Sequence, residues 1–112
     1  MNIRPDRRVQ IQISRIVGGS TTYNSVHLVP GLLFQNNVWY QAKLHAIGID
    51  PVILRAKIWK NGLLEPSEWM YLVRDTDPAL ATASGSLGVK VTGGSGLANL
   101  PITVSFDNFV AW

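Results

Sequence analysis

The chain has no cysteine, and it has little charge and little histidine. Its 112 residues include two histidines and only 15% charged side chains. The absence of cysteine excludes a disulfide framework and a zinc site with thiolate ligands. The two histidines, His27 and His45, each lie alone within an expected strand and outside any Gly-x-Ser-x-Gly context. Neither a histidine pair for a metal ion nor a nucleophilic triad is therefore predicted.

Long apolar runs and long helical patterns are also absent. No apolar stretch approaches the roughly 20 residues of a membrane-spanning helix. The first eight residues, MNIRPDRR, are charged and contain no apolar segment of the kind found in signal peptides, so we expect no signal peptide. Export would then occur by assembly into a particle or by cell lysis.

Apolar residues are plentiful, at 46% of the chain, which is enough for one packed domain. Because so few charges are available to cover its surface, we infer that a partner covers part of the apolar surface. The net charge is +3, and four of the ten basic residues fall within the first fifteen positions. We expect residues 1–7 to form a basic arm ahead of a single domain at 8–112. No nucleic-acid motif accompanies the arm, so nucleic-acid binding is not predicted.

Short segments of alternating polar and apolar residues, separated by turns of Gly, Pro, Asn and Asp, dominate the chain. A period of two is typical of half-buried strands. Asp77 and Pro78 favour one helical turn within 75–83, the only helical element expected. The expected strands are 8–17 (with a break in phase at 15–16 and a hairpin turn at Gly18-Gly19), 21–29 (ended by Pro30-Gly31), 32–34, 38–47, 52–59, 70–74, 86–92 and 102–112.

Seven or eight short strands at roughly ten-residue spacing predict an all-β fold. The expected architecture is an antiparallel β-sandwich or jelly roll. Within the clearest strands, the alternation also assigns faces. Val9, Ile11 and Ile13 share one face of the first strand. In 52–59, Leu54 and Ile58 face opposite to Arg55, Lys57 and Trp59.

The ordered series of segments in the second half resembles a known family. The series runs through WYQAKLHAIG at 39–48, LRAKIWKNG at 54–62, an EPxxW loop at 65–69, an aspartate-bearing turn, GSLGVKV at 85–91 and VSFDNFVAW at 104–112. It is similar to the closing strands of concanavalin A-like (laminin-G-like) modules of phage and bacterial surface proteins. The resemblance implies a sandwich used mainly as a binding or structural scaffold.

The chain is shorter than modules of that family, and the part it resembles is their C-terminal half. Either the chain is a compact variant, or its sandwich is truncated and neighbouring subunits complete the open edges. Low charge favours the second explanation, because unpaired strand edges need cover. We therefore expect a homo-oligomer or a protein docked on a larger assembly.

The carboxylates do not form a glycosidase pair. Glycosidases of this fold carry two acids on alternate residues of a strand, where they share a face. Asp75 and Asp77 have that spacing but lie in a proline-containing turn, and Glu65 and Glu68 flank a proline loop. The chain is therefore expected not to be an enzyme.

The acidic residues are also candidate ligands for calcium. The resemblance aligns Asp107 with an aspartate of the family's last strand, and Asp75 and Asp77 could contribute loop oxygens to Ca²⁺. The alternative is that Asp107 accepts hydrogen bonds from backbone amides and that Asp77 caps a turn.

Aromatic side chains are the remaining candidates for ligand binding. The candidates for glycan contact are Trp39, Trp59, Trp69 and Tyr71, with Arg55 nearby in sequence, because sugar rings present apolar C–H faces to aromatic planes. The alternative is that these aromatics pack within the core and against loops.

Together these observations predict a non-catalytic structural or adhesion module. The resemblance places it in a phage virion, at a tail, fibre or capsid surface, or otherwise in an extracellular setting. It would act by protein–protein packing, with or without glycan contact. The alternatives are a stand-alone carbohydrate-binding module and, third, a glycan-cleaving enzyme.

Overall fold

The computed structural model describes residues 1–48, 51–78, 88–93 and 103–107. Its ordered elements are β-strands, as the alternating sequence predicts. Their bounds are β1 Asn2–Ile3, β2 Arg8–Ile11, β3 Ser14–Val17, β4 Ser20–Tyr23, β5 His27–Leu33, β6 Tyr40–Ile47, β7 Val52–Lys60, β8 Tyr71–Asp75 and β9 Thr92–Gly93.

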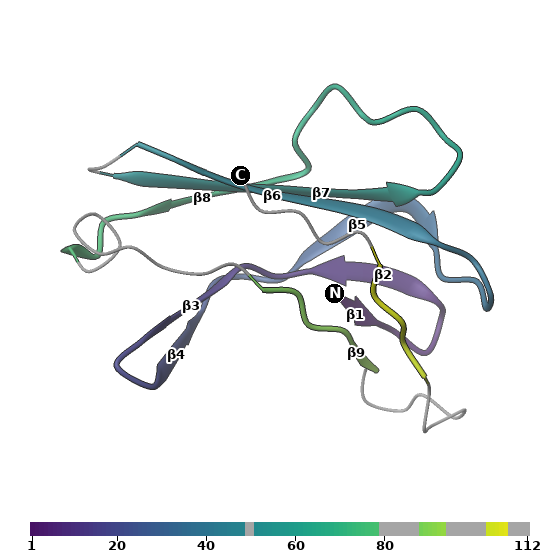
Figure 1. Cartoon of the computed structure of the whole chain (residues 1–112), viewed down its shortest axis with the longest axis horizontal. Helices are drawn as coiled ribbons and strands as arrows, with labels where there is room; N and C mark the ends of the chain where they lie inside the picture. Colours follow the sequence, from purple (N-terminus) through teal and green to yellow (C-terminus); the bar gives the residue numbers. More distant parts are fainter. Residues whose placement is uncertain (49–50, 79–87, 94–102, 108–112) are drawn as a thin grey trace.

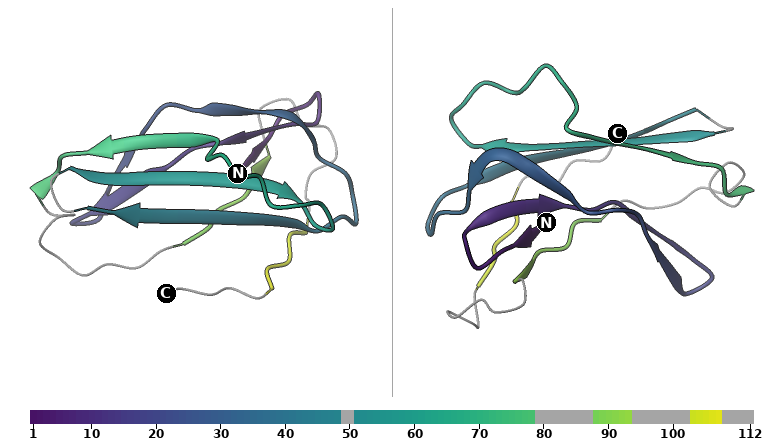
Figure 2. Two further views of the ribbon diagram at one scale, coloured as in Figure 1. Left: turned by 90° about the horizontal axis from the view of Figure 1, so that it is seen from above. Right: turned by 180° about the vertical axis from the view of Figure 1, so that it is seen from behind.

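Within the described residues, the strands form three sheets. One has the order β5-β2-β1-β9, a second has the order β6-β7-β8, and the third is the hairpin β3–β4. The first two sheets lie one over the other as two layers, and the hairpin extends beyond them (Figures 1 and 2). Of the strand pairs in the described part of the chain, all are antiparallel except β1 with β9, which is parallel and departs from the antiparallel expectation.

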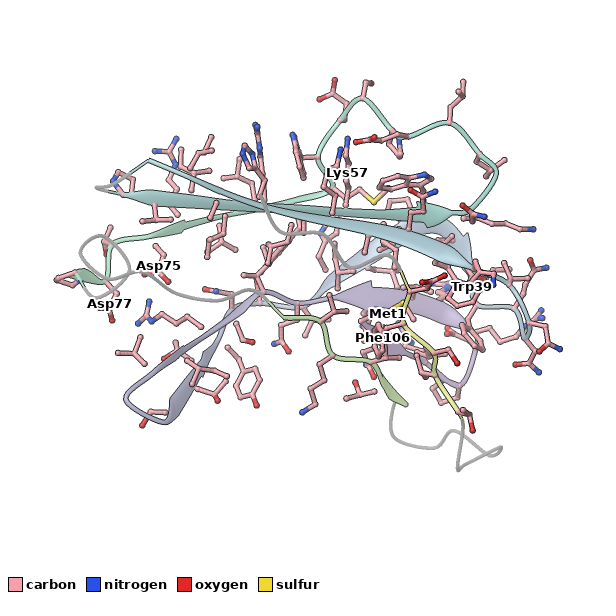
Figure 3. The ribbon with its side chains drawn as sticks, in the orientation of Figure 1. Met1, Trp39, Lys57, Asp75, Asp77 and Phe106 are labelled. Carbon is pink, nitrogen blue, oxygen red and sulfur yellow. The ribbon has the colours of Figure 1, made fainter. Side chains whose placement is uncertain are left out.

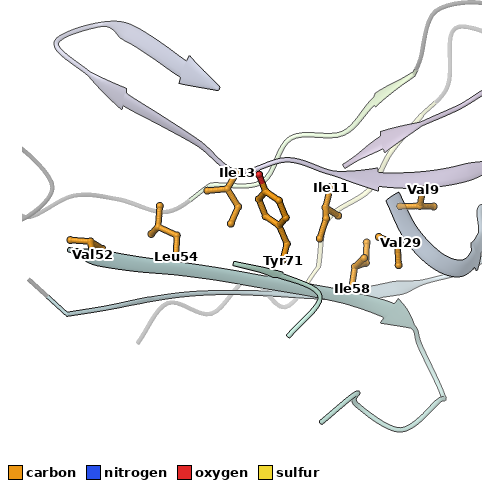
Figure 4. Close-up of a cluster of buried hydrophobic side chains, with 8 residues drawn as sticks. All are labelled: Val9, Ile11, Ile13, Val29, Val52, Leu54, Ile58 and Tyr71. Carbon is orange, nitrogen blue, oxygen red and sulfur yellow. The ribbon is translucent and has the colours of Figure 1, made fainter. Parts of the chain in front are cut away.

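The hydrophobic core lies between the two layers (Figure 4). One layer contributes Val9, Ile11 and Val29, and the other contributes Leu54 and Ile58, all buried. These are the faces that the period of two predicts, because alternate residues of a strand lie on the same side of its sheet. Burial of such side chains stabilises a fold by roughly 1.5–3 kcal/mol each. The core therefore holds the two layers together.

The first two expected strands are each divided. The segment 8–17 forms β2 and β3, and 21–29 contributes to β4 and β5. Between β3 and β4, Gly18 and Gly19 both have positive φ, at 58° and 81°, as a two-residue hairpin turn requires. The prediction of a turn at this position is confirmed.

The prediction that Pro30-Gly31 ends a strand is wrong. β5 runs through both residues to Leu33. β5 lies at the edge of its sheet, where a missing N–H is tolerated. Its pairing with β2 shifts register between Arg8 and Gln10, and this irregularity accommodates the glycine at φ 70°.

Residues 1–7 do not extend from the domain as an arm. β1 pairs with β2, and Ile3 is almost completely buried.

Two later expectations fall partly outside the described residues. In the expected strand 86–92, residues 88–91 are not in a strand, and Thr92 belongs to β9. In the expected strand 102–112, the described residues 103–107 are not in a strand. The expected helical turn at 75–83 extends into residues 79–83, which also lie outside the described part.

Candidate functional site

Three of the five predicted glycan-contact residues, Arg55, Trp59 and Trp69, lie on the outer face of the β6–β7 pair. Arg55, Lys57 and Trp59 alternate along β7 on the side away from the core. Their partners across the sheet are His45, Lys43 and Gln41 of β6. Trp69 comes from the loop 61–70, which covers this face in Figure 3. We call Lys43, His45, Arg55, Lys57, Glu65 and Trp69 the outer-face cluster.

The ring of Trp69 is the centre of the outer-face cluster. The guanidinium carbon of Arg55 lies 4.5 Å from its centroid, and Nζ of Lys57 lies 4.7 Å from it. His45 stacks on it at 5.8 Å with 19° between the planes. Cations are attracted to an indole ring at these distances. The indole of Trp69 is therefore already engaged by neighbouring protein groups.

Glu65 forms ion pairs with two lysines that stand directly opposite each other. Lys43 and Lys57 are cross-strand partners, an arrangement in which like charges repel. One oxygen of Glu65 lies 2.7 Å from Nζ of Lys43 and 2.8 Å from Nζ of Lys57. Hydrogen bonds from Lys43 and Lys57 lower the pKa of Glu65. The carboxylate thus remains ionised between the two lysines.

Lys57 also fixes the loop itself. Its ammonium group donates a hydrogen bond of 2.6 Å to the carbonyl of Pro66, and the residue is only 5% exposed. Trp59, beside it on β7, is 7% exposed. Both side chains face outward from the sheet and are nevertheless buried, because the loop lies over them. The burial of Trp59 therefore agrees with the interpretation that this side chain packs within the protein.

Tyr71, another predicted glycan-contact residue, is on the other side of the sheet. It belongs to the core, and its ring lies 5.6 Å from the ring of His27. Its hydroxyl donates a hydrogen bond to the carbonyl of Ser25 and lies 3.1 Å from Oγ of the same residue. Tyr71 therefore links the two layers and does not join the outer-face cluster.

Asp75 and Asp77 bind an arginine. Nη1 of Arg15 contacts both oxygens of Asp75, at 2.5 and 2.6 Å, and Nη2 lies 3.1 Å from Asp77. Burial alone would raise the pKa of Asp75, but hydrogen bonds from Arg15 and from the backbone N–H of Asp77 outweigh it, so the pKa is lowered. Both carboxylates are therefore already paired with the guanidinium group of Arg15.

Asp107 lies elsewhere, beside the beginning of β6. It lines a surface hollow together with Trp39, Gln41 and Asn61. Trp39 lies at the opposite end of the molecule from Asp75 and Asp77 (Figure 3). The three predicted calcium ligands are therefore not brought together. Among the described residues, no three His, Asp or Glu side chains gather as a group that could hold a metal ion.

The hairpin β3–β4 carries an exposed apolar face that the sequence did not identify as a site. Ile16 pairs with Thr21, and Tyr23 pairs with Ser14, so Ile16 and Tyr23 lie on the same side of the hairpin. Ile16 is 70% exposed and Tyr23 is 63% exposed. Arg15 alternates with Ile16 and therefore lies on the opposite side, where it reaches Asp75. The break in phase at 15–16 marks this region in the sequence, but it does not identify an exposed apolar face.

No family model, curated protein or solved structure matches the chain. Within the described ranges, no helix has the length and apolar character needed to cross a bilayer. The resemblance to concanavalin A-like modules therefore stays a prediction.

Proposed function

We propose that this chain is a non-catalytic structural or adhesion module that acts by packing against a second copy of itself. The hairpin β3–β4 is the proposed contact element. The observation that carries the proposal is the exposed apolar pair Ile16 and Tyr23 on one face of this hairpin. Exposed apolar patches of this kind mark interaction surfaces when they lie together.

The hairpin also has open edges without the usual protection. Among the described residues, β3 and β4 pair only with each other. Proteins normally protect such edges with charged residues or proline. Between Ser14 and Tyr23 the only charged residue is Arg15, and that side chain is held by Asp75 and Asp77. An identical hairpin of a second copy supplies both a complementary edge and a second apolar face, as a two-fold interface requires.

The hairpin is held in a fixed position relative to the layers. A two-stranded hairpin alone is marginally stable in water. Here Arg15 continues the inward-facing series of Val9, Ile11 and Ile13 and pairs with Asp75, which continues the inward-facing series of β8. This ion pair lies at the end of the core and anchors the base of the hairpin. An anchored apolar face can bind without a large ordering cost.

Three acidic side chains are paired with basic side chains, and this pairing supports a non-enzymatic role. Glu65 is bound by two lysines, and Asp75 and Asp77 are bound by Arg15. Carbohydrate binding at Trp59 and Trp69 is less favoured, because Trp59 is buried and Trp69 is in contact with Arg55 and Lys57.

The finer parts of the proposal rest on the sequence. We propose that the two layers are a β-sandwich of concanavalin A-like type and that the module belongs to a phage-type virion or another extracellular assembly. The family resemblance and the low charge support this setting. Mass spectrometry of purified particles from the source would detect peptides of this chain if the virion assignment is right.

Analytical ultracentrifugation of the whole chain over a hundredfold concentration range tests the assembly. We expect a concentration-dependent dimer or larger oligomer, and we expect the double variant Ile16→Ser, Tyr23→Ser to be monomeric. Leu64→Ser is the matched control, because Leu64 is 95% exposed in the loop 61–70, outside the hairpin. A wild-type protein that stays monomeric throughout, or a double variant that assembles normally, would refute the proposal.

A further inference from the structure

The loop 61–70 covers the outer face of β7 and is held there mainly by side chains. It arches over the sheet in Figure 1. At its two ends, the backbone N–H groups of Asn61 and Met70 donate to carbonyls of neighbouring segments, at 2.9 and 3.1 Å. Within the described part of the chain, residues 64–69 between these ends make no backbone–backbone hydrogen bond. The middle of the loop therefore stays on the sheet through its contacts with the outer-face cluster.

His45 makes one of these contacts possible only while its imidazole is neutral. Nε of Arg55 lies 3.1 Å from Nδ1 of His45. A guanidinium group donates hydrogen bonds and cannot accept them, so Nδ1 is the acceptor and carries no proton. The ring of His45 stacks on Trp69, and the guanidinium group of Arg55 lies over the same indole ring. The arrangement of His45, Arg55 and Trp69 is therefore that of a neutral histidine.

The surroundings of His45 are basic. The charged groups of the elements on this face are Lys43 of β6, Arg55 and Lys57 of β7, Arg74 of β8, and Glu65 and Glu68 of the loop. Hydrogen bonds from Lys43 and Lys57 lower the pKa of Glu65, so this carboxylate keeps its charge in the pH range where histidines titrate. Among the described residues, no carboxylate forms an ion pair with His45. A proton on His45 would thus add positive charge beside Arg55, and like charges at contact distance repel.

We propose that protonation of His45 releases the loop 61–70 from the sheet, so that the loop is an acid-sensitive cover over Lys57 and Trp59. The added proton occupies Nδ1, where it meets the Nε–H of Arg55, and two donors cannot bond to each other. Histidinium is attracted to an indole ring, but Arg55 and Lys57 already lie 4.5 and 4.7 Å from the centroid of Trp69. The repulsion therefore separates His45 from Arg55 and loosens the stack on Trp69. Because histidine changes its charge between about pH 5 and 8, the loop is closed at the upper end of this range and open at the lower end.

Opening changes what the outer face presents to other molecules. In the closed form, Lys57 and Trp59 are 5% and 7% exposed, and Lys57 lies beneath the loop in Figure 3. Removal of the loop makes an indole ring and an ammonium group accessible side by side on β7. This device goes beyond the proposed assembly function and is independent of it, because no residue of the outer-face cluster belongs to the hairpin β3–β4. Failure of one proposal therefore leaves the other standing.

Paramagnetic relaxation enhancement by a neutral gadolinium chelate tests the opening in the whole chain. The readout is the indole N–H signal of Trp59, identified by its loss in Trp59→Phe. We expect the open fraction to rise about tenfold as pH falls from about 7.5 to about 5, as for loss of one hydrogen bond to a charged group. The backbone N–H of Val9, which is 0% exposed, should stay protected at both pH values, and this distinguishes opening of the loop from unfolding.

Three variants assign the response to His45. His45→Gln provides an amide oxygen that accepts from Arg55 and does not titrate, so Trp59 should stay covered at both pH values. His45→Lys carries a positive charge throughout and should leave Trp59 accessible at both. His27→Gln, which changes the other histidine of the chain, is the matched control and should respond like the wild type. The proposal is overturned if Trp59 of the wild type is equally protected at both pH values, if His45→Gln keeps the response, or if His45→Lys stays closed at the higher pH.

Discussion

The ion pair between Arg15 and Asp75 offers the sharpest test of how the hairpin is held. In Asp75→Asn, the side chain keeps its size and one carbonyl oxygen but loses its negative charge. Asp75 is 4% exposed in the wild type, and its carboxylate accepts three hydrogen bonds, two from Arg15 and one from the backbone N–H of Asp77. The asparagine oxygen can still accept from Asp77, and Arg15 keeps its contact with the Asp77 carboxylate at 3.1 Å.

The cost at neutral pH follows from these contacts. A hydrogen bond to a charged group contributes about 1.5–3 kcal/mol and a neutral one about 0.5–1.5 kcal/mol. Replacing the charged acceptor by a neutral one therefore costs about 1–2 kcal/mol, part of which is offset because an amide is less costly to bury than a carboxylate. For a domain of this size, a change of that order lowers Tm by roughly 4–8 °C.

The difference between the two proteins should also depend on pH. The pKa of Asp75 is lower in the folded protein than its ordinary value of 3.8. A group whose pKa is depressed by folding stabilises the fold above its unfolded pKa, and that contribution is lost as pH falls through the folded pKa. The difference in stability should therefore be constant near neutral pH. It should begin to shrink as pH falls through about 4, and it should disappear at still lower pH.

Thermal melts followed by circular dichroism at pH 7, 5, 3.5 and 2.5 measure this difference. Asp6→Asn is the control, because Asp6 is an exposed partner of exposed arginines and should change Tm little. Equal melting temperatures for Asp75→Asn and the wild type at pH 7 would refute the reasoning. So would a difference that persists unchanged at pH 2.5.

Two further predictions concern the layers and the loop. Tyr71→Phe should lower stability by about 1–2 kcal/mol, because it leaves the carbonyl of Ser25 without its donor, and urea unfolding against the control Tyr23→Phe would measure this. An unchanged midpoint would contradict the role of Tyr71 in joining the layers. Glu65→Gln should lower Tm at low salt, because without the carboxylate the opposed ammonium groups of Lys43 and Lys57 repel each other. Added salt should reduce this loss of Tm, because it screens the repulsion. Glu68→Gln, in the same loop, is its control, and a loss that does not change with salt would argue against the repulsion.

The faces of the strands could be predicted from the sequence because they depend on a local period. Val9, Ile11 and Ile13 occur at alternate positions, and all three are buried on one side. Along β7, Leu54 and Ile58 face the core while Arg55 and Lys57 face away, as their alternation predicts. The glycine pair of the β3–β4 turn was recognisable for the same reason, since a hairpin turn needs positive φ at adjacent residues.

The sites could not be predicted in the same way, because they depend on contacts between distant segments. Alternation shows that Trp59 faces outward, but only the loop 61–70 decides that it is buried. Arg15 and Asp75 are 60 positions apart, and no local pattern pairs them. Trp39 and Asp107 share a hollow only because the segment 103–107 lies beside β6.

The sequence by itself determined that this protein is all-β, where most of its strands and turns lie, and which side of each clear strand is apolar. Tertiary structure alone decided which outward-facing residues are covered and which remain available to a partner. The physical reason is that a period of two follows from the geometry of one strand. Exposure depends instead on which part of the chain packs over that strand, and here the exposed residues include Ile16, Tyr23 and Trp39.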